Sequence, residues 1–298
     1  MIPAGTFMTE ELHDVQESLA RLTALNRAVA DAIGTLVLPI LPGPESQPAL
    51  EVTFRATLIR FFGWNHTLTK CNSEDVQAAV AGARACFELL ADVAVLIDSP
   101  MRIDEMRDWE HSAKLKHFEA RLRAGLMSAG TAPAGASHAQ KFVDEHGHQI
   151  RAMRAARWPA PKSPGKGRHP ERWYALNLPD VIRKHVATIG EDTLGAFDQF
   201  QSYMNWLTHG TSLAFFRGTS TAAFVDVSIF SASNAAQLAL KAALLVVGRV
   251  DPTVSGPVTE ELVKLYEASV VALEQACSRS AAWRQRQGDS PNEEGETP

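Results

Sequence analysis

A basic and an acidic side chain one helical turn apart are the first candidates for chemistry in this sequence. Arg84 and Glu88 stand four positions apart in ARACFELL, a segment that is otherwise apolar. Charges in such a setting must pair or bind something, because an isolated charge is costly to bury. Two interpretations follow. We favour an internal ion pair that joins helices of a bundle, and the alternative is an active-site or ligand pair in which Arg84 holds a phosphate or carboxylate.

A second candidate is a group of polar and aromatic side chains near residue 209. Tyr203, Trp206 and His209 recur every third residue in FDQFQSYMNWLTHG, and Gly210 follows them. This spacing puts the three on one strip of a helix that ends near Gly210. His209 then either caps the helix C-terminus, where the dipole favours a cation, or acts as an acid–base group in RNA cleavage with Tyr203 beside it.

The combination of these two motifs resembles a family of uncharacterised prokaryotic helical proteins. That family has an early Arg-x-x-x-Glu and a later, aromatic-rich Ser/Thr-His-Gly. The matching positions here are Arg84, Glu88, Tyr203, His209 and Gly210. The likeness spans roughly residues 54 to 213 and implies an all-helical fold. The family has no established activity, so the resemblance implies none.

The general build of that family is similar to HEPN ribonucleases, helical bundles of toxin and anti-phage systems that dimerise around an Arg-x(4–6)-His motif. The resemblance implies a metal-independent ribonuclease as an alternative function. The chain departs from the motif, because no arginine stands four to six residues before His209. Arg60 and His66 have the spacing, but six residues place two side chains about 120° apart around a straight helix. For this pair we favour a structural role, as polar side chains buried in the core with satisfied hydrogen bonds.

Basic residues gather between positions 151 and 172. The segment holds seven lysines and arginines, a single acid, Glu171, and Trp158. Cations beside aromatic rings are typical of surfaces that follow a phosphate backbone and stack bases. The candidate nucleic-acid contacts are Arg151, Arg154, Arg157, Lys162, Lys166 and Arg168. An RNA, an acidic partner protein or the chain's own acidic tail would match this charge, as would a solvated helix end followed by a mobile loop.

The sequence holds no pattern that is typical of a metal or cofactor site. His146 and His148 are two positions apart, so a helix would turn them to different sides. Two Glu-x-x-His motifs on facing helices, a nucleophile elbow and a phosphate-binding glycine loop are all missing from the sequence. We therefore expect no metal and no cofactor. Cys71, Cys86 and Cys277 are far apart and odd in number, which is typical of reduced thiols in a cytoplasm.

The elements that would position these residues are helices. The first, from Thr9 to a stop at Pro39, has a seam with alternating spacings of three and four, made of Leu12, Val15, Leu19, Leu22, Asn26, Val29, Ile33 and Leu36. A lone asparagine in such a seam fixes the register when it pairs with another polar group. The seam predicts either a dimer interface or a bundle helix whose Asn26 bonds within the same chain. We slightly favour the second, and the seam is also our leading candidate for a homodimer contact.

Further helices are expected over about 50–70, 73–98, 100–127, 138–156, 178–188, 191–209, 233–250 and from 259 onward, with a loop at 128–137. The helix over 50–70 is apolar around most of its circumference and is expected in the centre of the fold. The segment AAFVDVSIF, residues 222–230, alternates and predicts a short strand or hairpin. The fold class is therefore all-α, a bundle of about eight helices with at most one short strand or hairpin.

Composition limits the function classes. The 298 residues include 34 acids and 29 lysines and arginines, a formal charge of −5, which by itself favours neither nucleic acid nor an anionic membrane. Asp226 and Lys241 interrupt the most apolar region, so we expect a cytoplasmic protein without membrane contact. We expect one domain over 1–286, with a mobile basic insertion at 157–172 and a disordered acidic tail at 287–298. The expected function is a homodimeric binding or regulatory protein, with the ribonuclease as the alternative; whether the chain is an enzyme stays open.

Overall fold

The computed structural model describes residues 10–42, 49–71, 76–124, 133–158, 173–174, 176–209 and 221–288, except the side chains of 10–15, 133–137, 202–209, 221–226 and 283–288. The elements are α1 (Glu10–Ala32), the π-helix η1 (Ile33–Val37), α2 (Leu38–Ile40), α3 (Ala49–Leu68), α4 (Val76–Asp98), the 3₁₀-helix η2 (Pro100–Arg102), α5 (Ile103–Arg123), α6 (Pro133–Arg157), α7 (Leu178–Lys184), α8 (Val186–Ile189), α9 (Glu191–His209), α11 (Thr221–Val247) and α12 (Pro252–Gly288). No strand occurs among the described residues, and the prediction of an all-α helical bundle is confirmed.

The chain forms two compact units. Unit 1 consists of Met1–Ile97 and Ile182–Pro298, and unit 2 of Asp98–Val181. A single domain over 1–286 stays a prediction. Of the predicted insertion at 157–172, Arg157 ends α6, Trp158 follows it, and 159–172 lie outside the described residues. Of the predicted tail, residues 287 and 288 belong to α12, and 289–298 lie outside the description.

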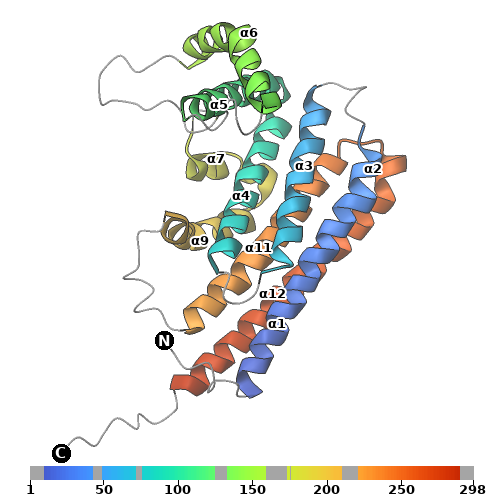
Figure 1. Cartoon of the computed structure of the whole chain (residues 1–298). Coiled ribbons are helices and arrows are strands. Elements are labelled where there is room, and N and C mark those ends of the chain that lie inside the picture. The colour runs from blue at the N-terminus through green and yellow to red at the C-terminus, as the bar shows by residue number, and fades with distance from the viewer. Residues whose placement is uncertain are drawn as a thin grey trace, which may run out of the picture. The chain divides into compact units, whose positions relative to one another are not determined.

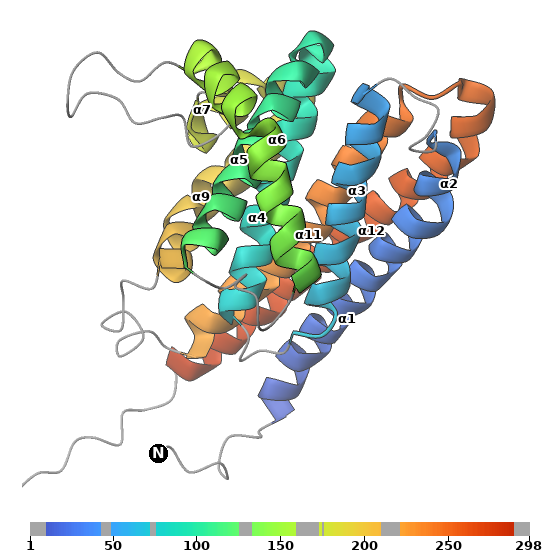
Figure 2. The same ribbon diagram turned by 45° about the horizontal axis from the view of Figure 1, so that its top comes forward.

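Unit 1 is built on four helices that lie side by side in both views: α1, α3, α11 and α12 (Figures 1 and 2). The blue α1 and the red α12 run along each other for most of their length, although they come from opposite ends of the chain. Arg279 on α12 binds Glu17 on α1, with 3.0 Å between Nη1 and Oε2. The first and last described helices therefore form one face of unit 1.

Asn26 shows how the seam of α1 is used. It is completely buried, and its side-chain amide donates to the carbonyl of Leu22, at 2.9 Å, and to the carbonyl of Ala232 on α11, at 3.0 Å. The second bond confirms that α1 is a bundle helix whose asparagine bonds within the same chain. The seam ends differently from the prediction. The wider π turn of η1 buries Val37, whereas Leu36 is half-buried.

Two predictions about unit 1 are wrong, one of a strand and one of the position of a helix. Residues 222–230 form the start of α11 instead of a strand. Val227, Ser228 and Ile229 are all buried, so the apparent alternation reflects a helix enclosed on several sides rather than a two-faced strand. The second correction concerns α3, which is not central. It buries Phe54, Phe61 and the face around them, but Ile59 on the other side is 48% exposed.

Helix α12 begins seven residues before the predicted start at Thr259. Asp251 caps it, because its carboxylate accepts hydrogen bonds from the backbone N–H of Thr253, at 2.8 Å, and from the Thr253 hydroxyl, at 2.6 Å. Those hydrogen bonds hold the pKa of Asp251 below its usual value. Pro252 occupies the first helical position, where its missing N–H costs nothing. The sequence Asp-Pro-Thr was therefore the helix signal. Helix α6 likewise begins at Pro133, inside the predicted loop.

Unit 2 contains the paired helices α5 and α6 (Figure 2). Aromatic rings join them: Trp109 lies edge-on to Trp158 with centroids 5.3 Å apart, and Phe118 lies edge-on to Phe142 at the same distance. Two ion pairs, Arg151–Glu119 and Arg157–Asp108, also connect α6 to α5. Unit 2 is held by contacts across this helical pair.

The most apolar helix is α11. Between Val227 and Val247 it is long and apolar enough to cross a bilayer by length and composition alone, and 67% of that window is buried inside the structure. Core helices of globular proteins have the same character. Its buried alanines let neighbouring helices approach closely.

Candidate functional site

Arg84 and Glu88 do pair on α4. Arg84 Nε lies 3.2 Å from Glu88 Oε1, and both side chains are about 30% exposed, at 30% and 31%. The pair sits at the edge of the helix rather than in its buried face, which carries Ala83 and Phe87. This geometry is that of an ordinary i,i+4 ion pair within α4. The favoured interpretation, an internal pair that joins helices of the bundle, stays a prediction. A ligand-binding role for the pair stays a prediction.

Helices α4 and α9 touch within unit 1. The ring of Phe87 lies edge-on to that of Phe197, with centroids 5.3 Å apart. His209 is twelve residues further along α9, about 18 Å along the helix axis. The helix ends at His209 as predicted, but the side chains of Tyr203 and His209 lie outside the described residues, as does Gly210. The described contact therefore joins α4 to α9. A shared site of Arg84 and His209 stays a prediction.

Two of the predicted nucleic-acid contacts are engaged by acids of unit 2. Arg151 Nη2 lies 2.6 Å from Glu119 Oε1, and Arg157 Nη2 lies 2.6 Å from Asp108 Oδ2. Each pair joins α6 to α5, so these arginines hold the helices together, a role that the sequence analysis did not foresee. Lys162, Lys166 and Arg168 lie outside the described residues.

Arg154 differs from its two neighbours on α6. The pKa of Lys116 on α5 is lowered, mainly because the lysine is partly buried and also because the positive charge of Arg154 repels it. These two cations therefore lie close together on this part of α5 and α6. A role in RNA binding for it stays a prediction.

Arg60 and His66, the pair with ribonuclease spacing, are exposed on α3, not buried as the favoured interpretation held. The imidazole of His66 stacks on the ring of Phe62, with centroids 6.0 Å apart and planes 3° from parallel. Both residues are exposed because they lie on the side of α3 that faces solvent. Whether the pair cleaves RNA stays a prediction.

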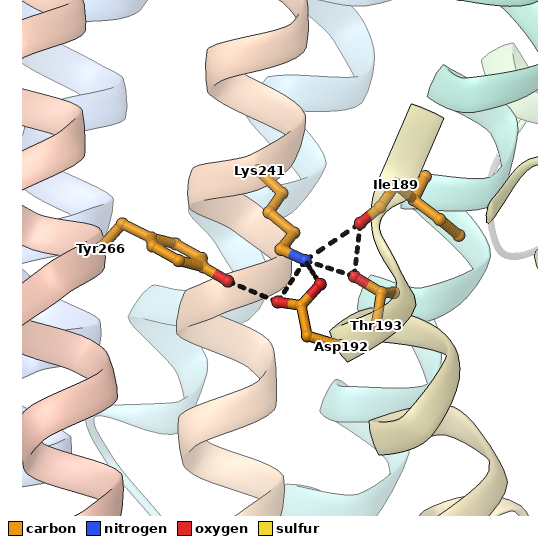
Figure 3. Close-up of polar contacts among 5 residues, drawn as sticks. All are labelled: Ile189, Asp192, Thr193, Lys241 and Tyr266. Carbon is orange, nitrogen blue, oxygen red and sulfur yellow. Dashed lines mark hydrogen bonds and ion pairs between the residues drawn. The ribbon is translucent and has the colours of Figure 1, made fainter. Parts of the chain in front are cut away.

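A polar cluster that the sequence analysis missed joins α9, α11 and α12 (Figure 3). Lys241 on α11 donates from Nζ to both carboxylate oxygens of Asp192, at 2.6 and 2.7 Å. The same ammonium lies 2.6 Å from the hydroxyl of Thr193 and 2.9 Å from the carbonyl oxygen of Ile189. Tyr266 on α12 donates its hydroxyl to Asp192, at 2.7 Å.

The electrostatics of the cluster indicate a structural role. Partial burial and the hydrogen bond to Asp192 raise the pKa of Tyr266 well above its usual value, so the phenol keeps its proton. Partial burial raises the pKa of Asp192, but the bonds from Lys241 and Tyr266 outweigh it, and the net pKa is lowered. A protonated phenol and a neutralised ammonium supply neither a base nor a nucleophile. The cluster is a clamp on the start of α9.

Gly190 lets the chain reach this clamp. It connects α8 to α9 with φ of +91°, in a region that L side chains rarely adopt. A Cβ there would collide with Asp192 Oδ1 and would lie 3.2 Å from Lys241 Nζ. Glycine at 190 is therefore required by both the backbone and the ion pair.

A cavity of about 270 Å³ opens among α1, α3, α4 and α11 in unit 1. It is lined by Gln16, Leu19, Ala20, Thr23, Leu68, Cys71, Ala79, Ser228 and Ala232. Gln16 and Ala20 are exposed at its mouth, and Leu68 and Ala79 are buried at its inner end. The cavity is thus an apolar recess with one open side.

Ser228 is a buried residue in the lining of this recess. It is 5% exposed, and its hydroxyl oxygen is itself enclosed and has no hydrogen-bond partner among the described residues. A buried serine in a helix usually donates to the carbonyl four residues earlier, so an unpartnered one is unusual. Leaving such a group unsatisfied costs roughly 1–3 kcal/mol. The hydroxyl is therefore a cost to the fold and offers no open contact to a ligand.

Within the described residues no group of three or more histidine, cysteine, aspartate or glutamate side chains is placed to hold a metal ion. Comparison of the chain with protein-family models, with curated proteins and with solved structures found no match in any of the three.

Proposed function

We propose that this chain is a non-catalytic helical binding protein and that the recess of unit 1 holds its ligand. The observation that carries the proposal is the mostly apolar cavity among α1, α3, α4 and α11, with the polar side chains of Gln16 and Thr23 in its lining. Small-molecule sites are typically apolar recesses with a few polar groups that orient the ligand.

The charged groups support binding over catalysis. In the Lys241–Asp192–Tyr266 clamp and in the ion pairs of α5 and α6, the charges neutralise one another. Groups held in this way stabilise a fold and are poorly placed to take or give a proton.

The volume sets the size of the ligand. An engineered protein cavity of roughly 150 Å³ binds benzene, and the recess, at about 270 Å³, is larger and open on one side. A bicyclic ring system is therefore a suitable first probe, and we choose naphthalene.

The test compares two leucine substitutions on α4. Ala79 is buried at the inner end of the recess, whereas its neighbour Ala78 is exposed and does not line it. We expect the wild type and Ala78→Leu to bind naphthalene saturably, as measured by its fluorescence, and Ala79→Leu to lose binding.

A second variant guards against misfolding, because an added side chain in a packed interior costs about 1–3 kcal/mol. Ala20→Phe blocks the exposed mouth without entering the core and should also abolish binding. Circular dichroism checks that each variant is folded. Absence of saturable binding to the folded wild type, or equal binding by all four proteins, would contradict the proposal.

A further inference from the structure

We propose that unit 2 carries a second binding site, between α5 and α6, for an uncharged heteroaromatic ring with a hydrogen-bond donor and an acceptor on its edge, such as a cyclic lactam. A cavity of about 310 Å³ opens between these helices, and all of its lining residues belong to unit 2. An engineered cavity of roughly 150 Å³ binds benzene, so this volume is sufficient for a bicyclic ring. The site is separate from the recess of unit 1.

One wall of the cavity is apolar and comes from α6. Ile150 is buried, and Phe142 and Met153 are half-buried. The ring of Phe142 lies edge-on to the imidazole of His146, with centroids 5.1 Å apart. The ammonium of Lys114 lies 4.6 Å from the centroid of the same phenyl ring but does not line the cavity. Aromatic and thioether side chains of this kind pack well against the body of a planar ring.

The open side of the cavity is polar. His111 comes from α5, His146 and Gln149 come from α6, and all three are exposed. Within the described part of the chain, the side chains of His111 and Gln149 make no hydrogen bond. A neutral imidazole and a primary amide each offer both a donor and an acceptor. These groups can therefore pair with the N–H and the C=O of a lactam that enters between the two helices.

The charges around the cavity are balanced, which favours an uncharged ligand. Asp108 lines the cavity, and its Oδ2 lies 2.6 Å from Nη2 of Arg157. Glu145, whose carboxylate lies 3.9 Å from His146, also lies 3.7 Å from the ammonium of Lys141. A charged ligand would lose hydration on entry without gaining an unpaired counter-charge from the lining.

The experiment measures the affinity of quinazolin-4-one, an uncharged bicyclic lactam, and of 1-naphthoate, an anion of similar shape, by isothermal titration calorimetry at pH 7.5. His111→Phe and His146→Phe each keep a ring in the cavity and remove its nitrogens. The matched controls are His117→Phe on α5 and His148→Phe on α6, which are exposed and do not line the cavity. All four positions are exposed, so the variants should stay folded, and circular dichroism checks this.

We expect the wild type and both control variants to bind quinazolin-4-one with equal affinity. His111→Phe and His146→Phe should each bind it about 5- to 10-fold more weakly, which corresponds to one ordinary hydrogen bond. Ala79→Leu, which fills the recess of unit 1, should bind the lactam like the wild type. The wild type should bind 1-naphthoate more weakly than quinazolin-4-one.

Methyl NMR of labelled methionine locates the ligand. The ring current of quinazolin-4-one should shift the signal of Met153, which lines the cavity, and leave that of Met101, which is 88% exposed and does not line it. Absence of saturable binding to the folded wild type, equal affinity in all four histidine variants, or tighter binding of 1-naphthoate would overturn the proposal. Loss of lactam binding in Ala79→Leu would place the ligand in the recess of unit 1, which would overturn the second site and support the first.

Discussion

The Lys241 ammonium lies 2.6 Å from one carboxylate oxygen of Asp192 and 2.7 Å from the other, and the two side chains differ sharply in exposure. That of Lys241 is 15% exposed and that of Asp192 is 61% exposed. The lysine therefore depends on its partner for neutralisation, whereas the aspartate keeps access to water. The pair is asymmetric, and its two halves should respond differently to substitution.

Removal of the acid should cost more stability than removal of the base. Asp192→Ala leaves a largely buried ammonium without its counter-charge, and we expect a loss of about 2–3 kcal/mol. Lys241→Met keeps an apolar stem of similar length and leaves an aspartate that water can solvate, so the expected loss is below about 1.5 kcal/mol. Urea unfolding of both variants measures the difference. A larger loss for Lys241→Met would contradict the asymmetry.

The same carboxylate should make stability depend on pH. The pKa of Asp192 is lower in the folded protein, despite the opposing effect of burial, because Lys241 and Tyr266 donate to it. Its contribution is therefore complete above the usual aspartate value, near pH 4, and is lost as the pH falls through the lower folded value.

Asp192→Asn lacks this ionisation. The difference in unfolding free energy between the wild type and Asp192→Asn should thus be constant from pH 5 to 7 and shrink below about pH 4. Denaturant titrations at several pH values measure it, and the comparison cancels the effects of other acids. A difference that grows on acidification would refute the assignment.

Gly190 should tolerate no side chain. Gly190→Ala forces a Cβ into a positive-φ position and against Asp192, so we expect a loss of at least about 1–2 kcal/mol. Gly195 lies within α9 with nothing near its missing Cβ, and Gly195→Ala should be neutral or should stabilise the protein by up to about 1 kcal/mol. Thermal unfolding of the matched pair tests this. Equal effects at both positions would contradict the requirement for glycine at position 190.

Asn26 should affect stability rather than assembly. Asn26→Ala removes the amide that bonds to Ala232 and should cost about 1–3 kcal/mol. Because Leu22, Asn26 and Val29 of the seam are buried within the chain, the oligomeric state, measured by sedimentation at fixed concentration, should not change. If the wild type is a homodimer, as expected from the sequence, another surface must form it. If Asn26→Ala stayed folded but became monomeric, the result would indicate that the seam of α1 does form a dimer interface.

The ribonuclease alternative makes the opposite prediction to our proposed function. We expect purified wild type, His209→Ala and His66→Ala to leave total RNA and tRNA equally intact, and expression of all three to leave growth unaffected. Gel analysis of the RNA and growth curves measure these outcomes. Cleavage by the wild type that disappears in His209→Ala would refute a non-catalytic function.

Periodicity predicted the helices where one side faces water. The seam of α1 through Leu22 and Asn26 and the bounds of α9 follow from a contrast between apolar and polar faces. The start of α11 lacks that contrast, because Val227, Ser228 and Ile229 are all buried, and a pattern of period two appeared there by chance. Enclosed helices lose the signal on which such predictions depend.

The functional features were harder to predict for two physical reasons. Asp192 lies 49 residues from Lys241 and 74 from Tyr266, and no local pattern records contacts over such separations. The lysine in an apolar helix was the available signal. The recess is lined by small, uncharged side chains such as Ala79 and Ser228, which look like ordinary packing residues in a sequence.

The pairing of α1 with α12 has a consequence for biosynthesis. Glu17 and Arg279, which join the two helices, are 262 positions apart, and unit 2 lies between them in the chain. A ribosome exposes α1 long before α12 exists, so the apolar face of α1 must wait for its cover while the intervening segment folds. Chaperones that hold nascent apolar helices should therefore meet this chain at α1, and premature termination before α12 should yield an aggregating product.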